Sequence, residues 1–481
     1  MNVDLLIGNS NQPASDGNTF SRMNPLTGAL ATQAAAGTER DADAAVAAAS
    51  GALAAWTETG PNERRALLLR AADRLDGMRD LFMKAMMTEI GTTEVWSAFN
   101  VKLAAGILRE AASLTTQIGG EVIPSDKPDC IALAVRQPAG VCLGIAPWNA
   151  PIILGVRAIA VPLACGNTVV LKASELCPGT HRLIGDVFRE AGFPAGVVNV
   201  VTNAPAAAAS IVEQLIANPA VKRINFTGST RIGRIVAELA AKQLKPVLLE
   251  LGGKAPVVVL EDADIDAAVA AVTFGAFINQ GQVCMSTERV IVDEGIADQF
   301  VARLGAKAAS LSAGAPGSGA VIGSMVDEAP AKRVAELIDD AVAKGAKRVA
   351  GGDRAGTVVP ATVIDRVVPG MRIYSEESFG PVVSVIRAAD TEDAIRLAND
   401  TEYGLSAAVF GRDIARALAV AKRIESGICH INGPTVHDEA QMPFGGVKGS
   451  GYGRFGGQAG IAEFTELRWI TIQTKPQHYP F

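Results

Sequence analysis

The chain has 481 residues, of which 49% are hydrophobic and 20% are charged, a composition typical of a globular protein with about two or three domains. It carries 44 basic and 50 acidic residues and only 5% aromatic residues. This balance argues against a nucleic-acid-binding surface and against attachment to anionic membranes. We therefore expect neither nucleic acid nor a membrane as a partner.

The cysteines and the N-terminus indicate the cellular compartment in which the protein is expected. The N-terminal residues lack the basic segment and long apolar run of a signal peptide. The most apolar stretch, residues 141–171, is interrupted by prolines and is too broken to span a bilayer. None of the six cysteines forms a CxxC pair and only four histidines are present, so no metal site is expected. These features predict an intracellular, cytoplasmic protein with reduced cysteines.

The first part of the chain is predicted to be helical. Residues 39–56 place apolar side chains at helical spacing, with Asp41 or Asp43 as the expected N-cap. A second helix is expected from Pro61, a residue favoured in the first turn, to a stop at Gly91. A third helix is predicted over residues 94–117.

From residue 141 onward, short β-branched runs alternate with helical stretches. A second series of the same design begins near Ala255 and continues to about Asn432. This alternation indicates parallel sheets with helices on both faces. The predicted fold class is therefore α/β, with two doubly wound, Rossmann-like domains that join near residues 251–253. In the first series, strands are predicted at 141–145, 168–171, 197–201, 223–226 and 247–251, and helices at 181–191 and 231–242.

Two segments remain outside these series. Residues 130–140, CIALAVRQPAG, can form an extended arm, and residues 466–474, ELRWITIQT, alternate like a strand. Such segments either complete the sheet of a partner subunit or form edge strands of the chain's own sheet. The sequence leaves both interpretations open.

Several polar groups follow predicted strands, where ligands bind in a doubly wound sheet. In RINFTGST, Gly228 and Ser229 lead from a strand into a helix whose N-terminus suits a pyrophosphate, although a plain tight turn has the same pattern. Lys172 and Glu175 follow another strand and can meet ribose hydroxyls, although an exposed charged loop is the commoner fate of such residues. Because Glu175 would repel a 2′-phosphate, this pair favours NAD over NADP.

Three further residues can carry chemistry. Asn149 lies in a turn stiffened by Pro147 and Pro151, where its amide either donates to an oxyanion or bonds nearby backbone. Glu250 ends an apolar strand, so we expect a partly buried carboxylate with a raised pKa, either a general base or a paired structural group. Cys284 follows NQGQV beside polar residues and is either a nucleophile or one more packed cysteine.

Six motifs together carry a family resemblance: PWN, FTGST, LELGGK, FINQGQVCMSTERVIV, EESFGPV and PFGGVKGSGYGR, in this order. Over nearly its whole length the chain resembles the NAD(P)-dependent aldehyde dehydrogenase superfamily. The resemblance implies that Cys284 attacks the aldehyde, that Asn149 and the backbone N–H of Cys284 hold the oxyanion, and that Glu250 activates water. It also places Glu463 where many members carry a second acid near the proton exit path.

The same resemblance implies a cofactor domain over residues 1–117 and 139–250, a catalytic domain over 251–446, and an oligomerisation arm over 118–138 and 457–481. It implies NAD as the cofactor and a homodimer or homotetramer as the assembly. Lys172 and Glu175 would bind the adenine ribose, Ser229 the pyrophosphate, and Glu377 the nicotinamide ribose. The full set of expected cofactor-binding residues is Ile145, Pro147, Trp148, Lys172, Glu175, Phe226, Gly228, Ser229, Leu251, Glu377 and Phe379.

Within the superfamily, the stretches FNVKLAAGILREAASLTTQIGGEVIPSD and GNTVVLKASE resemble bacterial salicylaldehyde, vanillin and benzaldehyde dehydrogenases. This implies an aromatic aldehyde as the substrate. Arg157, on the helix that lines the family's substrate tunnel, would contact a ring hydroxyl or methoxy oxygen, or be a salt-bridged helix residue. Alternatively, Arg157 would bind the carboxylate of a semialdehyde such as succinic semialdehyde. The expected pocket residues are Trp96, Phe99, Leu154, Arg157, Val283, Met285 and Phe444.

Overall fold

Two large sheets organise the chain, and the computed structural model describes all of its residues, 1–481. The first sheet has eight strands in the order β20-β12-β11-β8-β9-β10-β2-β3. Strands β8 to β12 pair in parallel, whereas the edge strands pair antiparallel. The bounds are β2 (Leu5–Ile7), β3 (Ser10–Gln12), β8 (Val141–Ile145), β9 (Thr168–Lys172), β10 (Val198–Val201), β11 (Val221–Thr227), β12 (Val247–Glu250) and β20 (Gly451–Tyr452).

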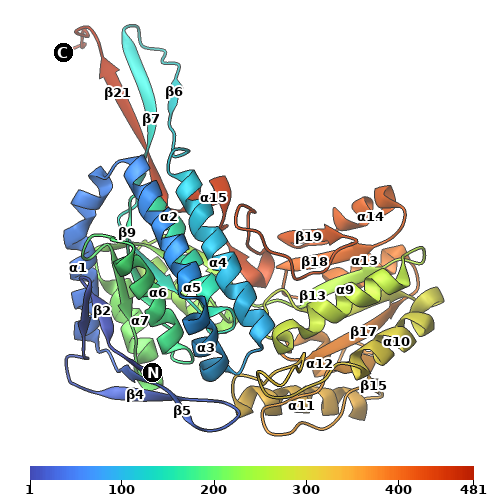
Figure 1. Cartoon of the computed structure of the whole chain (residues 1–481). Coiled ribbons are helices and arrows are strands. Elements are labelled where there is room, and N and C mark those ends of the chain that lie inside the picture. Colours follow the sequence, from blue (N-terminus) through green and yellow to red (C-terminus); the bar gives the residue numbers. More distant parts are fainter.

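Helices cover both faces of this sheet (Figure 1) because its strands place apolar side chains alternately on either side. On one face, Leu143 and Ile145 pack with α1, α7 and α8. On the other face, Cys142 packs with α2 to α6. The bounds are α1 (Glu39–Glu58), α2 (Pro61–Gly77), α3 (Arg79–Ile90), α4 (Glu94–Leu114), α5 (Pro151–Ala164), α6 (Pro178–Glu190), α7 (Ala208–Ala217) and α8 (Thr230–Lys242), with a 3₁₀ turn η1 (Pro205–Ala207) before α7.

The second sheet has seven strands in the order β15-β16-β17-β14-β13-β18-β19, all parallel except at the β15–β16 edge. Helices α9 and α10 pack on one face and α11 to α14 on the other. The strands are β13 (Ala255–Val259), β14 (Thr287–Asp293), β15 (Lys347–Ala350), β16 (Thr362–Asp365), β17 (Val382–Ala388), β18 (Ser406–Phe410) and β19 (Ile428–Ile431). The helices are α9 (Ile265–Phe277), α10 (Glu294–Ala309), α11 (Glu328–Ala343), α12 (Arg372–Ser375), α13 (Thr391–Asn399) and α14 (Ile414–Ala421).

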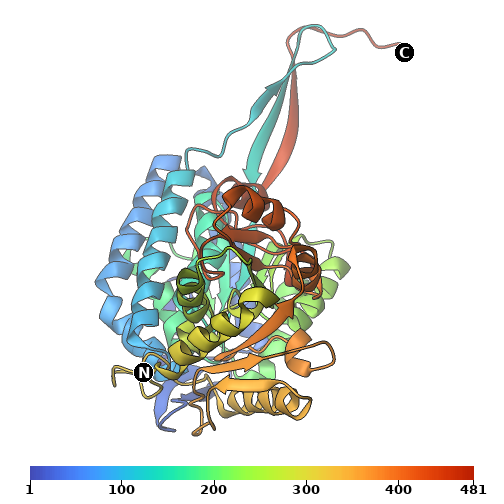
Figure 2. The same ribbon diagram turned by 90° about the vertical axis from the view of Figure 1, so that its right-hand side faces the viewer.

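A narrow three-stranded sheet projects from the body of the molecule (Figures 1 and 2). It consists of β6 (Glu121–Ile123), β7 (Cys130–Pro138) and β21 (Thr465–Gln473) in the order β21-β7-β6. The two segments left over by the sequence analysis therefore pair antiparallel with each other, with Thr465 opposite Pro138 and Gln473 opposite Cys130. They join neither large sheet. We call these three strands the arm.

Three expectations about the N-terminal part were wrong in detail. The N-cap of α1 is Thr38, which forms a capping box with Asp41 at the third helical position, so neither aspartate is the cap. The helix expected from Pro61 to Gly91 breaks at Met78 into α2 and α3. The residues before α1 form short strands, among them β1 (Asn2–Val3), β4 (Thr19–Met23) and β5 (Leu30–Ala35) of a small separate sheet.

The α/β fold class with two doubly wound sheets is confirmed. The structure contains no helix that is both long and apolar enough to cross a membrane.

Candidate active site

Adjacent parallel strands of the first sheet end at one edge, and four of the predicted residues lie there. Ile145 at the end of β8 is in register with Lys172 on β9 and with Phe226 on β11. Glu250, the last residue of β12, is in register with Thr227 on β11. The carboxyl ends of parallel strands are where doubly wound sheets bind ligands. Strand pairing thus brings together residues that lie more than one hundred positions apart in the sequence.

The turn before Cys284 is held in an unusual backbone conformation. It contains the 3₁₀ turn η2 (Ile278–Gly281), in which Asn279 and Gln280 have positive φ angles of 47° and 57°. Gly281 also has a positive φ, and a Cβ atom there would lie 2.1 Å from the carbonyl oxygen of Gly380, so the turn requires glycine. The Asn279 amide donates to the carbonyl oxygen of Asn149 at 3.0 Å, which ties this turn to the PWN turn. Cys284 therefore follows a turn whose backbone conformation is fixed by these contacts.

Cys284 differs from the cysteines that fill the core. Cys142, Cys165 and Cys177 are buried, whereas Cys284 is half-buried. Burial of the thiol, together with the charge of the adjacent Glu250, raises the pKa of Cys284 well above its ordinary value. At neutral pH the thiol is therefore protonated, and its proton must leave before the sulfur can act as a nucleophile.

Glu250 has the raised pKa that its place in the sequence predicted. Its side chain is 1% exposed, and neither carboxylate oxygen accepts a hydrogen bond of standard geometry. Burial raises the pKa of Glu250 to about 7, with the Cys284 thiol and Arg157 as neighbours that partly oppose the shift. A carboxyl group with this pKa, free of hydrogen-bond partners, can accept and release protons near neutral pH.

Asn149 is fixed by α4 and by the turn before Cys284. Its carbonyl oxygen accepts from the Trp96 indole N–H of α4 at 2.9 Å and from Asn279. Its side-chain amide donates to the carbonyl oxygen of Gln282 at 3.0 Å, across 133 residues of sequence. The alternative that this amide bonds the backbone of its own turn is therefore wrong. An amide carries two N–H donors, and the other one has no partner within the protein.

Two cavities meet at these residues. One has a volume of about 450 Å³ and the other of about 400 Å³. Asn149 and Cys284 line both of them, and no other residue does. Glu250 lines only the first cavity, which we call the strand-end cavity, and Arg157 lines only the second, which we call the aromatic cavity. The Cys284 thiol thus lies where the two cavities join.

Most of the predicted cofactor residues surround the strand-end cavity. Ile145, Lys172, Glu175 and Phe226 do not line it. Lys172 and Glu175 form an ion pair with each other beyond the end of β9. Although burial opposes the change, the Lys172 ammonium lowers the pKa of Glu175 below its ordinary value, so that the carboxylate is charged. The predicted residues that do line the cavity are Pro147, Trp148, Gly228, Ser229, Leu251, Glu377 and Phe379.

These residues fit a dinucleotide. Ser229 is the N-cap of α8, and Gly228 beside it lacks a side chain where a Cβ atom would lie 2.5 Å from the Phe226 ring. The N-terminus of α8 therefore lies at this cavity. Such a terminus suits a pyrophosphate, and its binding there stays a prediction. Glu377 faces the same cavity, and burial together with the nearby charge of Glu288 raises the pKa of Glu377 to about 7.

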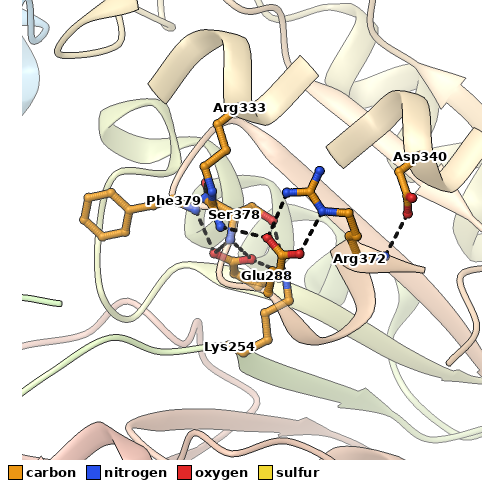
Figure 3. A network of polar contacts seen from close by, with 8 residues as sticks. Lys254, Glu288, Arg333, Asp340, Arg372, Ser378 and Phe379 are labelled. Carbon is orange, nitrogen blue, oxygen red and sulfur yellow. Dashed lines mark hydrogen bonds and ion pairs between the residues drawn. The ribbon is translucent and has the colours of Figure 1, made fainter. Parts of the chain in front are cut away.

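A buried network that the sequence analysis missed holds the loop with Glu377 and Phe379 (Figure 3). The carboxylate of Glu288 on β14 accepts the backbone N–H groups of Ser378, at 2.8 and 2.9 Å, and Phe379, at 3.0 Å. Its counter-ion is Lys254, at 2.5 Å, and both side chains are buried. Figure 3 shows the Phe379 ring pointing away from this network. Lys254 and Glu288 both lie within motifs of the sequence, but their pairing depends on the contact between β13 and β14.

All seven predicted pocket residues line the aromatic cavity. Arg157 on α5 lines this cavity, and its guanidinium pairs with Asp438 at 2.5 Å. It is therefore a salt-bridged helix residue, one of the alternatives left open by the sequence, and its contact with a substrate stays a prediction. The guanidinium also lies 4.5 Å from the centroid of the Phe444 ring. The sequence analysis missed Asp438 because it lies in a loop with no characteristic spacing. Other residues of this wall that it missed are Val95, Ala150, Ile153, Phe274, Ile278, Pro434, Val436 and His437.

Glu463 ends the short helix α15 (Gly457–Glu463), where its carboxylate accepts the backbone N–H of Arg454 at 3.2 Å. It lines neither of the two cavities. The proton-exit role implied for Glu463 stays a prediction.

Comparison with known proteins identifies the class. Residues 12–470 match the model of the aldehyde dehydrogenase family. The chain is 62% identical to vanillin dehydrogenase of Pseudomonas fluorescens and 51% identical to salicylaldehyde dehydrogenase of Pseudomonas sp. strain C18, in each case over 100% of both chains. A crystal structure of salicylaldehyde dehydrogenase from Pseudomonas putida G7, complexed with salicylaldehyde, matches with a TM-score of 0.98 at 51% identity over 100% of both chains.

The chain belongs to the aldehyde dehydrogenase family, which confirms the resemblance stated from its motifs. It is an aldehyde-oxidising enzyme of a family that uses NAD or NADP.

Proposed function

We propose that this enzyme oxidises aromatic aldehydes to carboxylic acids with NAD as the hydride acceptor. The observation that carries the proposal is the junction of two cavities at Cys284 and Asn149. An aldehyde in the aromatic cavity and a nicotinamide in the strand-end cavity would meet at the thiol. The similarity to vanillin and salicylaldehyde dehydrogenases over the whole chain supports the same substrate class.

In the proposed reaction, the Cys284 thiol gives its proton to a base, and Glu250 is the neighbouring group with a suitable pKa. The sulfur then forms a bond to the carbonyl carbon. The free N–H of the Asn149 amide and the backbone N–H of Cys284 donate to the resulting oxyanion. When bound, NAD would supply the acceptor for the hydride of this carbon, which would leave a thioester on Cys284. Glu250, after releasing the thiol proton to solvent, takes a proton from water as the water oxygen bonds to the thioester carbon. The C–S bond then breaks, the carboxylic acid leaves, and the sulfur of Cys284 recovers the proton held by Glu250.

The preference for NAD over NADP rests on the Lys172–Glu175 pair. Glu175 is charged, because the Lys172 ammonium lowers its pKa against the effect of burial. A carboxylate that accepts from a ribose 2′-hydroxyl repels a 2′-phosphate at the same place. We therefore propose that Lys172 and Glu175 bind the adenine ribose, Ser229 the pyrophosphate and Glu377 the nicotinamide ribose.

The ion pair between Arg157 and Asp438 favours aromatic aldehydes over semialdehydes. A substrate carboxylate would have to compete with Asp438 for the Arg157 guanidinium, and Asp438 would repel it. The walls of the aromatic cavity instead offer aromatic and apolar side chains, including Trp96, Phe99 and Phe444, which suit a benzene ring.

We also propose that the enzyme is a homodimer or homotetramer that associates through the arm. The arm exposes Val122, Ile131, Leu467 and Trp469, and exposed apolar side chains gathered on paired strands are typical of an interface. In this assignment residues 1–117 and 139–250 form the cofactor domain and residues 251–446 form the catalytic domain. Residues 118–138 and 457–481, which include the three strands of the arm, form the oligomerisation part.

The function is tested with purified protein, a panel of aldehydes, and NAD or NADP. We expect NADH to form with benzaldehyde, salicylaldehyde and vanillin at specificity constants at least tenfold above those for propanal and succinic semialdehyde. Cys284→Ser should reduce turnover more than about 10³-fold, whereas the control Cys429→Ser, on β19 outside both cavities, should leave it unchanged. Faster turnover of succinic semialdehyde than of any aromatic aldehyde would overturn the substrate assignment.

A further inference from the structure

The Asp438 carboxylate has one engaged oxygen and one free oxygen. Oδ2 accepts from the Arg157 guanidinium at 2.5 Å. Oδ1 is buried and has no hydrogen-bond partner, and the side chain as a whole is 8% exposed. A buried acceptor without a donor costs free energy, and native proteins rarely keep one without a use. Because Asp438 lines the aromatic cavity, a ligand there can supply the missing donor.

The position of the Asp438 carboxylate in the cavity follows from the position of its partner Arg157 on α5. The helix begins at Pro151, next to Asn149, and Arg157 lies six residues further along. At 1.5 Å per residue this is about 9 Å from the catalytic end of the helix. Leu154, one turn earlier, also lines the cavity. A benzene ring with its aldehyde at Cys284 would therefore lie beside Leu154 and direct its far edge to Asp438 and Arg157.

The charges around Asp438 determine which substituent on the far edge of the substrate ring would bind there. Arg157 already compensates the charge of Asp438, so an added cation is not required, and an added anion would be repelled. A neutral hydroxyl can donate its proton to Oδ1. The Arg157 side chain makes only one hydrogen bond, through Nη2, so it keeps further N–H donors for the hydroxyl oxygen or for an adjacent methoxy oxygen.

We propose that Asp438 determines specificity by accepting a hydrogen bond from a phenolic hydroxyl on the ring edge remote from the aldehyde. The inference rests on the proposed function and narrows its substrate class to benzaldehydes hydroxylated at the para position or its neighbour. An ortho-hydroxyl lies beside the aldehyde at the Cys284 end and does not reach Asp438. Asp438 touches the substrate far from the reacting carbon, so its contribution is to binding.

The test compares 4-hydroxybenzaldehyde with 4-methoxybenzaldehyde, which lacks the donor, in the wild-type enzyme and in Asp438→Asn. Hydrogen bonds to a charged acceptor predict that the wild type prefers the hydroxyl compound about tenfold to hundredfold in kcat/KM. Asp438→Asn keeps the shape but can present an N–H in place of the acceptor, so the preference should vanish or reverse. The change should fall on KM, because the bond forms equally in the ground state and the transition state.

Benzaldehyde and salicylaldehyde serve as internal standards. In Asp438→Asn, kcat/KM for 4-hydroxybenzaldehyde relative to benzaldehyde should fall by about tenfold or more, whereas the ratio between benzaldehyde and salicylaldehyde should stay within about threefold of its wild-type value. Glu439→Gln, at the exposed neighbouring position where the side chain pairs with His437, is the matched control and should leave the hydroxyl preference intact. A hydroxyl-to-methoxy ratio that stays the same in Asp438→Asn would overturn the proposal. If Asp438→Asn does not fold, a hydroxyl-to-methoxy ratio near one in the wild-type enzyme overturns the proposal instead. Absence of wild-type activity on every aromatic aldehyde tested would refute the proposed function, which is a separate result.

Discussion

At the scale of single residues, the raised pKa of Glu250 is the feature with the most direct kinetic consequence. Burial raises this pKa to about 7, so the group changes protonation within the range in which the enzyme is assayed. Only the carboxylate can take a proton from the thiol or from water. Since the protonated form is inactive as a base, turnover should fall as the pH falls through about 7 and level off above it.

Replacing Glu250 by glutamine removes the base with little change in shape. We expect Glu250→Gln to lower kcat by about 10²- to 10⁴-fold, the usual contribution of a general base, and to abolish the rise in rate through pH 7. The measurement is the pH profile of kcat between pH 5 and 9. Glu213→Gln, at an exposed position on α7, should keep the wild-type profile. If the Glu250 variant kept the same inflection in its pH profile, that inflection would have to come from another group.

Local patterns in the sequence made Glu250 and Cys284 candidates, the first at the end of an apolar strand and the second in a polar setting, with a structural alternative for each. Only the family resemblance implied the roles of base and nucleophile, which stay predictions. Neither the patterns nor the resemblance pointed to Asp438 or Glu288. The roles of these two depend on contacts with Arg157 and with the loop at residues 376–379, and such contacts exist only after α5 has packed and strands β13 and β14 have paired.

At the scale of elements, the buried ion pair between Glu288 and Lys254 joins two neighbouring strands to the loop of the strand-end cavity. The side chains are 4% and 0% exposed, so each depends on the other for compensation of its charge. Breaking such a pair on one side leaves an uncompensated buried charge. The loop with Glu377 and Phe379 would lose a charged acceptor for two of its N–H groups at the same time.

Glu288→Gln should therefore affect both stability and cofactor binding. We expect a loss of about 3 kcal/mol in the free energy of unfolding, measured by urea denaturation, and a several-fold increase in the KM for NAD. The matched control is Glu402→Gln, which removes half of an exposed pair with Arg234 and should cost less than about 1 kcal/mol. Equal effects of the two substitutions would contradict the role given to the network.

The errors made at the scale of elements have physical explanations. The periodic pattern of residues 61–90 continues across Met78, so nothing in the apolar spacing marks the end of α2. Thr38 was overlooked as an N-cap because two aspartates nearby have the same preference, and only the backbone geometry decides between them. Among the strands before α1, β1, β3 and β4 bury few side chains and lack the run of apolar residues that identified β8 and β9. Strand β2 is fully buried, but its apolar run is only three residues long.

At the scale of the whole molecule, the arm is the part of the chain that packs least against the rest. It extends away from both large sheets (Figure 2), and Leu467 and Trp469 on β21 are 62% and 76% exposed. Apolar side chains of this size are stabilised when a second copy of the chain covers them.

The double substitution Leu467→Asp and Trp469→Asp should therefore shift the enzyme to monomers, because both carboxylates would be buried without partners in the interface. Sedimentation velocity or light scattering would measure the mass. Leu244→Asp, which changes an even more exposed leucine (92%) away from the arm, should leave the mass unchanged. Monomers of the wild-type chain at micromolar concentration would contradict the proposed assembly.

The two cavities share only Asn149 and Cys284, and this separation has a consequence for how such enzymes diverge. The residues that line the aromatic cavity lie mainly on α4, α5 and the loop at residues 434–438, and apart from Asn149 and Cys284 none of them lines the strand-end cavity. Substitutions of its apolar residues can change the ring that fits, whereas Arg157 and Asp438 also affect the pKa of Glu250 through their charges.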